Sequence, residues 1–102
     1  MSDFVTVAQW ADLKNGSAIK VALAGRLLAI FRDNDQLFVL DDECPHKGGP
    51  LSSGWIEHGH VYCPLHGWKF ELGTGACETN CDKPAKTYPA RVLNGEVQVQ
   101  IG

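Results

Sequence analysis

Two short motifs each place a cysteine and a histidine close together in the chain. The first is Cys44-Pro45-His46 and the second is Cys63-Pro64-Leu65-His66. Each motif offers one thiolate and one imidazole, and both groups are ligands for transition metals. A proline follows each cysteine, and its fixed φ stiffens a loop that must hold a ligand in place. The four side chains predict a metal centre built from two loops.

Two kinds of metal centre fit two cysteines and two histidines. One is a tetrahedral structural zinc ion, and the other is a [2Fe–2S] cluster in which two histidines replace two thiolates on one iron. Zinc fingers usually take like ligands from the same loop, whereas here each loop supplies one of each kind. A dinuclear cluster suits that arrangement because each loop then reaches both irons. The pattern favours the cluster, and a structural zinc module that mediates protein contacts is the alternative.

The sequence around both motifs resembles the two ligand boxes of Rieske ferredoxins. The matching segments are residues 44–51 (CPHKGGPL) and 63–70 (CPLHGWKF), and residues 71–75 resemble the exit from the second box. The resemblance implies an all-β fold, a small antiparallel sandwich or barrel with a loop-rich cluster-binding subdomain inserted. It also implies one Rieske-type [2Fe–2S] cluster per chain, with Cys44 and Cys63 on one iron and His46 and His66 on the other.

Departures from the family pattern predict a low reduction potential. Rieske proteins of respiratory complexes carry an extra cysteine in each box, joined as a disulfide, where this sequence has Gly49 and Leu65. They also offer Ser and Tyr hydroxyls where this sequence has Trp68 and Phe70. Hydrogen bonds to the cluster sulfurs raise the potential. Without these hydroxyl groups the potential should be lower. With no membrane anchor expected either, the chain resembles the soluble, low-potential class of Rieske proteins.

The segment that follows the second box narrows the choice of redox partner. Residues 76–92 look most like the small subunit of NAD(P)H-dependent assimilatory nitrite reductase, whose partner would be a large reductase subunit. Ferredoxin components of aromatic-ring dioxygenases, which work with a reductase and an oxygenase, share the ligand boxes and the size. In either case the chain is expected to transfer electrons without a catalytic centre of its own. The tip formed by residues 46–49 and 65–68, with Pro84 nearby, is the expected docking surface.

Composition excludes several other classes of protein. The 102 residues, 44% hydrophobic and 21% charged, predict one globular domain over residues 1–102, with the cluster-binding subdomain at about 41–84. A net charge of −3 argues against nucleic-acid binding. The longest apolar run, residues 27–31, is too short to span a membrane. The N-terminus does not resemble a signal peptide, so we expect a cytoplasmic protein.

Strand-like segments flank the ligand boxes. The alternation predicts hairpins around Ala24-Gly25, around residues 33–35, around His58-Gly59 and around Asn94-Gly95, the last being the strongest hairpin signal. Residues 68–72 are a further candidate strand. The insertion between residues 41 and 84 looks poor in apolar residues, so we expect the metal centre rather than a core to hold it together.

The remaining candidate residues have structural interpretations. Cys77 and Cys81 are predicted to be reduced thiols, although their C-x₃-C spacing also permits a disulfide or a metal. His58 and His60 are expected in a solvated turn, with auxiliary metal binding as the alternative. Three aromatic residues should form the small core of the subdomain: Trp55, Trp68 and Phe70.

Overall fold

The computed structural model describes residues 4–44, 49–65, 67–78 and 83–100. The prediction of an all-β fold is confirmed, because the described residues form strands and two short 3₁₀ turns and no α-helix. No helix in this part of the chain is long and apolar enough to cross a membrane. The elements are β1 (Phe4–Gln9), η1 (Trp10–Asp12), β2 (Ser17–Leu23), β3 (Arg26–Asp33), β4 (Gln36–Asp41), η2 (Leu51–Ser53), β5 (Trp55–Glu57), β6 (His60–Tyr62), β7 (Lys69–Glu71), β8 (Ala90–Leu93) and β9 (Glu96–Gln100).

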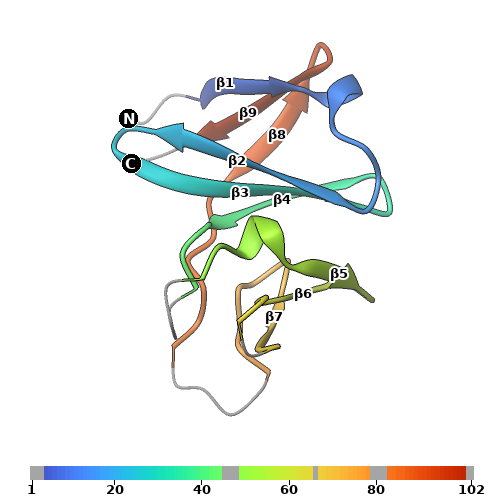
Figure 1. Cartoon of the computed structure of the whole chain (residues 1–102). Helices are drawn as coiled ribbons and strands as arrows, with labels where there is room; N and C mark the ends of the chain where they lie inside the picture. The colour runs from blue at the N-terminus through green and yellow to red at the C-terminus, as the bar shows by residue number, and fades with distance from the viewer. Residues whose placement is uncertain (1–3, 45–48, 66, 79–82, 101–102) are drawn as a thin grey trace.

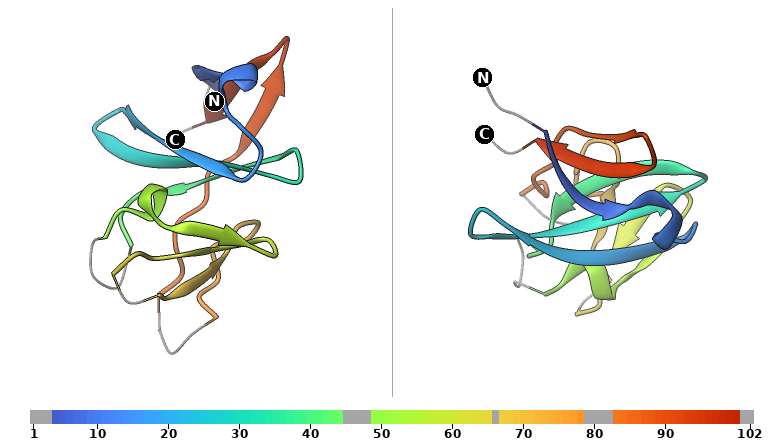
Figure 2. Two further views of the ribbon diagram at one scale, coloured as in Figure 1. Left: turned by 45° about the vertical axis from the view of Figure 1, so that its right-hand side comes forward. Right: turned by 90° about the horizontal axis from the view of Figure 1, so that it is seen from above.

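The strands form three antiparallel sheets that follow one another from top to bottom in Figure 1. The first sheet has the order β1-β9-β8, the middle sheet β2-β3-β4 and the third sheet β5-β6-β7. The third sheet is inserted in sequence between β4 and β8, and the chain then returns to the first sheet. The left view of Figure 2 also shows the middle sheet lying between the other two.

The four hairpins have the turns that the sequence predicts. Both central residues of each turn have positive φ, the conformation that matches the twist of the flanking strands. They are Ala24 (53°) and Gly25 (77°), Asn34 (51°) and Asp35 (59°), His58 (51°) and Gly59 (78°), and Asn94 (52°) and Gly95 (77°). No local signal in the sequence predicts β1, which pairs with β9 at the other end of the chain.

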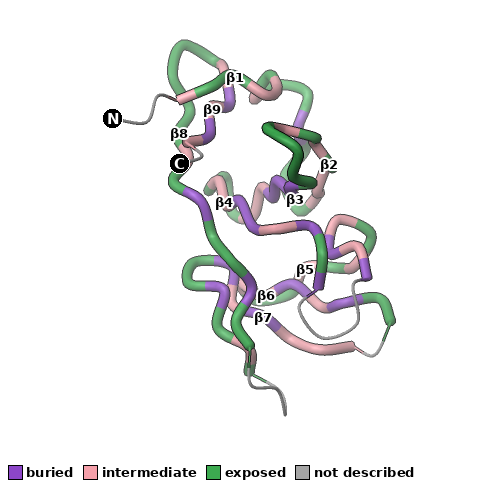
Figure 3. Tube along the Cα trace, turned by 90° about the vertical axis from the view of Figure 1, so that its left-hand side faces the viewer, coloured by how far each residue is buried: buried purple, intermediate pink, exposed green. Residues whose placement is uncertain are grey.

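The middle sheet is buried on both faces, and this explains the apolar run of residues 27–31. Leu28 and Ile30 of β3 pack with Val97 and Val99 of β9 in one apolar cluster, here called the base core. Alternate residues of β3 point the other way, into a second cluster. Continuous apolar sequence is the pattern of a strand buried on both sides, and Figure 3 shows β3 as the most buried stretch of the middle sheet.

The second cluster, here called the loop core, joins the middle sheet to the third sheet. Its fully buried members include Ala29 and Phe31 from β3, with Val61 and Phe70 from the third sheet. Leu40, Leu51, Leu72 and Ala85 complete it together with two cysteines. The expectation that the insertion lacks a core is therefore wrong. Its apolar residues are widely spaced in the sequence, and they form a core only against the middle sheet.

An extended segment, residues 83–89, leads the chain back from the third sheet to the first. The Asp41 N–H donates to the Lys86 carbonyl at 2.9 Å, and the Tyr88 N–H donates to the Val39 carbonyl at 3.0 Å. At its other end, the Ala85 N–H donates to the Gly75 carbonyl at 2.7 Å. The segment thus ties the end of β4 to the loop that follows β7.

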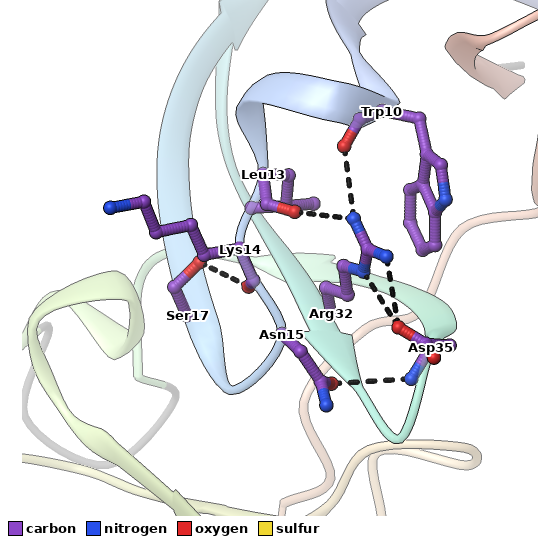
Figure 4. A network of polar contacts seen from close by, with 7 residues as sticks. All are labelled: Trp10, Leu13, Lys14, Asn15, Ser17, Arg32 and Asp35. Carbon is purple, nitrogen blue, oxygen red and sulfur yellow. Dashed lines mark hydrogen bonds and ion pairs between the residues drawn. The ribbon is translucent and has the colours of Figure 1, made fainter.

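Arg32 of β3 fixes the connection between β1 and the middle sheet (Figure 4). Its Nη1 donates to the Trp10 carbonyl (3.1 Å) in η1 and to the Leu13 carbonyl (2.7 Å) directly after it. The guanidinium lies 4.0 Å from the centroid of a Trp10 ring and donates to Asp35 Oδ1 from Nη2 at 2.9 Å. The Arg32 side chain thereby joins η1 and Leu13 to the turn between β3 and β4.

Neighbouring residues of β3 offer a test of the two cores. Ile30→Ala removes contacts from the base core and Phe31→Ala from the loop core, and each should lower the free energy of unfolding by about 2–5 kcal/mol. In the absence of denaturant, Phe31→Ala should also hold fewer irons per chain, whereas Ile30→Ala should keep the wild-type iron content. Denaturant titrations and iron analysis measure both effects. Equal iron content in the two variants would show that the loop core does not support the metal centre.

Candidate metal centre

Cys44 and Cys63 lie in the loop core, below the middle sheet. Cys44 follows the end of β4 by three residues, and Cys63 comes directly after β6. Each residue is 1% exposed, and neither forms a disulfide. Two buried thiols from separate loops thus belong to one apolar cluster. Their predicted partners, His46 and His66, lie outside the described residues.

The two ligand loops are closed in the same way. The Cys44 N–H donates to the Gly49 carbonyl at 2.8 Å, and the Cys63 N–H donates to the Trp68 carbonyl, also at 2.8 Å. Each cysteine therefore begins a loop that ends five residues later. In the second loop the Gly67 N–H also donates to the Cys63 carbonyl at 2.9 Å, and Gly67 has a φ of +68°. Both loops are thus closed by the same hydrogen bond, from the cysteine N–H to the carbonyl five residues later.

Gly49 brings the two loops into contact. A Cβ at Gly49 would lie 2.8 Å from Leu65 Cγ and 3.2 Å from Cys63 Sγ. The backbone of the first loop thus passes close beside Cys63 Sγ of the second, and only glycine leaves that space open. Two buried thiols, two matched loops and this open approach fit a group shared between the loops, as a [2Fe–2S] cluster would be.

The cross-loop disulfide of respiratory Rieske proteins cannot form here, because Gly49 and Leu65 carry no thiol. Gly49 and Leu65, which occupy the two positions in this chain, lie against each other. The contact between the loops is apolar, and Leu65 is 51% exposed. The second loop therefore presents an apolar side chain to solvent next to the buried Cys63.

Asp42 anchors the first ligand loop, a role that the sequence analysis did not identify. The side chain is buried, and its Oδ1 accepts the Ser52 N–H at 2.8 Å at the start of η2. The Asp42 carbonyl accepts the Leu51 N–H at 2.7 Å. Lys20 Nζ lies 3.5 Å from Asp42 Oδ2. The carboxylate thus links β2, the approach to Cys44 and the chain that follows the first loop.

A second polar group fixes the end of β4. The Tyr88 hydroxyl donates to Asp41 Oδ1 at 2.5 Å and accepts from Arg26 Nη1 at 3.2 Å. Burial raises the pKa of the Tyr88 hydroxyl above its usual 10.0, and the hydrogen bond to Asp41 raises it further. The hydroxyl therefore stays protonated, and able to donate, through neutral pH. This holds residues 83–89 against the strand that leads to Cys44.

Several other predictions for this region have mixed outcomes. Phe70 is fully buried and Trp68 packs against the loop core, as expected, but Trp55 is 47% exposed and stacks on Tyr62 with ring centroids 5.3 Å apart. Trp55 lies on the outer face of the third sheet, because its neighbour Ile56 takes the inward position.

Cys77 is disulfide-bonded, so the prediction of a reduced thiol there is wrong. The short C-x₃-C spacing is compatible with pairing, and Cys81 lies outside the described residues.

The two histidines of the third sheet differ from each other. His58 is exposed at a turn with a φ of 51°, as predicted. The side chain of His60 is only 17% exposed and its Nε2 lies 2.9 Å from Glu78 Oε1, so the expectation of a solvated turn is wrong for this residue. His60 begins β6 and leaves the turn, which brings its ring against residues that are distant in the sequence.

Comparison with known proteins identifies the class to which this site belongs. Residues 3–89 match the sequence profile of the Rieske [2Fe-2S] domain. The chain therefore belongs to the Rieske [2Fe-2S] domain family, and the cofactor of that family is a [2Fe–2S] cluster that transfers electrons.

The relatives include ferredoxins of dioxygenase systems and small subunits of nitrite reductases. The chain is 35% identical to the ferredoxin subunit of anthranilate 1,2-dioxygenase from Burkholderia cepacia, over 95% of this chain and 96% of that protein. Its structure is similar to the Sphingomonas yanoikuyae B1 ferredoxin, with a TM-score of 0.90, 29% identity and coverage of 98% and 100%. It is also similar to a Mycobacterium tuberculosis protein assigned as the small subunit of an NADH-dependent nitrite reductase, with a TM-score of 0.91, 26% identity and coverage of 100% and 97%.

Removal of the Asp42 carboxylate should weaken the first ligand loop. Asp42→Ala leaves the Ser52 N–H without its partner, which should cost about 1–3 kcal/mol of unfolding free energy and reduce the iron content. Asp42→Asn keeps an acceptor oxygen and should retain more iron. Glu43→Ala is the matched control, because it removes an exposed carboxylate from the next position of the same segment. Wild-type stability and iron content in Asp42→Ala would exclude this role for the carboxylate.

Proposed function

We propose that this chain is the electron-transfer component of an NAD(P)H-dependent nitrite reductase, its small subunit. The observation that carries the proposal is the structural likeness to the Mycobacterium tuberculosis small subunit along 100% of this chain and 97% of that one. The resemblance of residues 76–92 to such subunits supports it from the sequence. The chain would pass single electrons within a larger, cytoplasmic reductase and would contribute no substrate site of its own.

Four residues are proposed as ligands of the cluster. Cys44 and Cys63 would bind one iron and His46 and His66 the other, which supplies a one-electron redox couple. Burial of the two thiols supports this assignment, as do the matched closures of the two loops. Two ferric ions, two sulfides and two thiolates sum to zero charge, and reduction makes the site −1. The neutral imidazoles leave one iron without thiolate charge, so the added electron should localise on the histidine side.

The second candidate is the ferredoxin component of an aromatic-ring dioxygenase system. The observation that favours it is the 35% identity to the Burkholderia cepacia ferredoxin subunit over nearly the full length of both chains. The two candidates share the cluster and the fold and differ only in the electron donor and acceptor. A structural zinc module is no longer a candidate, since the chain belongs to a [2Fe–2S] family.

The reduction potential should lie at the low end of the Rieske range, on the order of −150 mV. Trp68 and Phe70 offer no hydroxyl group to the cluster sulfurs, so the reduced, more negative state gains no stabilisation from one. A titration followed by circular dichroism measures the potential, and the double variant Trp68→Ser with Phe70→Tyr should raise it. A wild-type potential well above zero would contradict the absence of such donors.

Growth of the source organism separates the two candidate functions. Deletion of the gene should abolish growth on nitrate or nitrite as the sole nitrogen source and leave growth on ammonium unchanged. The wild-type gene should restore growth and Cys63→Ser should not. If the deletion instead abolishes growth on an aromatic carbon source and spares growth on nitrate, the dioxygenase assignment is correct and the proposal fails.

The same complementation tests the docking surface, which we place at the tip around residues 46–49 and 65–68. Leu65 is exposed beside Gly49, and Val92 of β8, 40% exposed on the first sheet, is the matched control. Leu65→Glu should fail to restore growth while keeping its cluster by absorbance, and Val92→Glu should restore it. Full rescue by a cluster-containing Leu65→Glu would place the docking surface elsewhere.

A further inference from the structure

We propose that the outer face of the third sheet binds a divalent transition-metal ion, with Zn²⁺ as the reference ion. The ligands would be His60, Glu71 and Glu78, whose donor atoms all lie within 4.8 Å of one another. The proposed site is separate from the two cysteine loops, and it does not depend on which redox partner the chain serves.

Strand register brings the three residues together. His60 of β6 is paired directly with Glu71 of β7. On the other side of β7, a bridge joins Phe70 to Cys77, and the Glu78 N–H donates to the Lys69 carbonyl at 2.8 Å. Since side chains alternate between faces, burial of Val61 and Phe70 in the loop core places the three candidate ligands on the opposite face. They come from three adjacent lengths of chain.

The orientation of the His60 ring is the strongest evidence for a cation. Its Nδ1 lies 2.9 Å from the His58 carbonyl oxygen. A carbonyl oxygen only accepts hydrogen bonds, so Nδ1 must carry the proton, and the Nε2 of a neutral ring presents a lone pair. Donation of one ring nitrogen to a backbone carbonyl is the usual support of a metal-binding histidine, because it turns the other nitrogen toward the metal.

His60 Nε2 lacks the partner that its burial requires. The atom is buried and has no hydrogen bond, although Glu78 Oε1 lies 2.9 Å away. A lone pair facing a carboxylate oxygen at that distance is repulsive. A cation bound by both atoms removes the repulsion and satisfies the buried nitrogen. The alternative is an imidazolium ring paired with Glu78, and the experiment below distinguishes the two.

The donor set and its surroundings suit zinc. Imidazole nitrogen and carboxylate oxygen are both zinc ligands, and three protein ligands leave the fourth tetrahedral position to a water. Bonds of about 2.0–2.2 Å place the ligands of one ion no more than about 4 Å apart, so the side chains need to close only slightly. Thr74 Oγ1 donates to Glu71 Oε1 at 3.0 Å and orients that carboxylate. Among the charged groups around the site, Lys69 Nζ lies 3.9 Å from Glu78 Oε1. Glu57 of β5 is the strand partner of His60 on the side away from β7.

The ion would stabilise the loop between β6 and β7 by joining the two strands that flank it. β6 leads directly into Cys63, and β7 begins directly after Trp68, so the loop between them is anchored in these two strands. A metal that joins His60 to Glu71 links the strands on both sides of that loop, and Glu78 adds the segment after β7. The proposed role is therefore structural, in support of the cluster site.

The test uses untagged protein with its iron–sulfur cluster intact, so that the cysteine loops are not available to zinc. After EDTA treatment that leaves iron content and absorbance unchanged, the protein is equilibrated with excess Zn²⁺, and the zinc and iron per chain are measured. Wild type should bind one zinc per chain, and its unfolding temperature should rise with Zn²⁺ concentration, as mass action requires. His60→Gln and Glu78→Gln should lose both effects. Glu57→Gln, which changes the same face outside the site, should keep them.

Two results would overturn the proposal. One is zinc uptake that is absent in wild type, or that is equal in wild type, His60→Gln and Glu78→Gln. The other is an unfolding temperature that responds to Glu78→Gln and to protonation of His60 but not to Zn²⁺, which would assign the pair as a simple imidazolium–carboxylate contact. Absorbance of the cluster in every variant confirms that folding is retained.

Discussion

Burial of the middle sheet on both faces is the constraint on which the rest of this structure depends. Alternate residues of β3 enter different cores, so Ile30 contributes to the base and Phe31 to the region of the ligand loops. The third sheet has only three short strands, and sheets of that size need a second layer to bury their apolar face. The middle sheet supplies that layer. The electron-transfer site is therefore built on the same strands that hold the base together.

This arrangement places the two cysteines inside a core rather than at the end of flexible loops. Their backbone N–H groups close the loops, and Asp42 and the Tyr88–Asp41 pair fix the approach to the first loop. These hydrogen bonds hold the backbone on the approach to Cys44 and at the start of both loops. The exposed Leu65 beside Gly49 leaves an apolar side chain at the surface close to the buried Cys63.

Local features of this chain could be predicted from its sequence, and features that depend on distant contacts could not. Two residues with positive φ define each hairpin, so Ala24-Gly25 and Asn94-Gly95 were sufficient signals. The two motifs carry their own spacing, and the family match confirms the [2Fe–2S] cofactor that they imply. In contrast, β1 exists because it pairs with β9, and the loop core exists because residues scattered between 41 and 84 meet β3. Asp42 and His60 acquired their roles through the same long-range contacts, and the local sequence around each predicts a solvated loop or turn.

The central claim is that the two matched loops bind one [2Fe–2S] cluster through two sulfurs and two ring nitrogens of this chain. Pulsed electron paramagnetic resonance of the reduced protein tests it directly, because it detects nitrogen nuclei bound to the reduced iron. The account predicts two strongly coupled histidine nitrogens, with one of them lost or altered in His46→Cys and likewise in His66→Cys. A reduced cluster without nitrogen coupling, or purified protein that holds zinc and no iron in these loops, would contradict it.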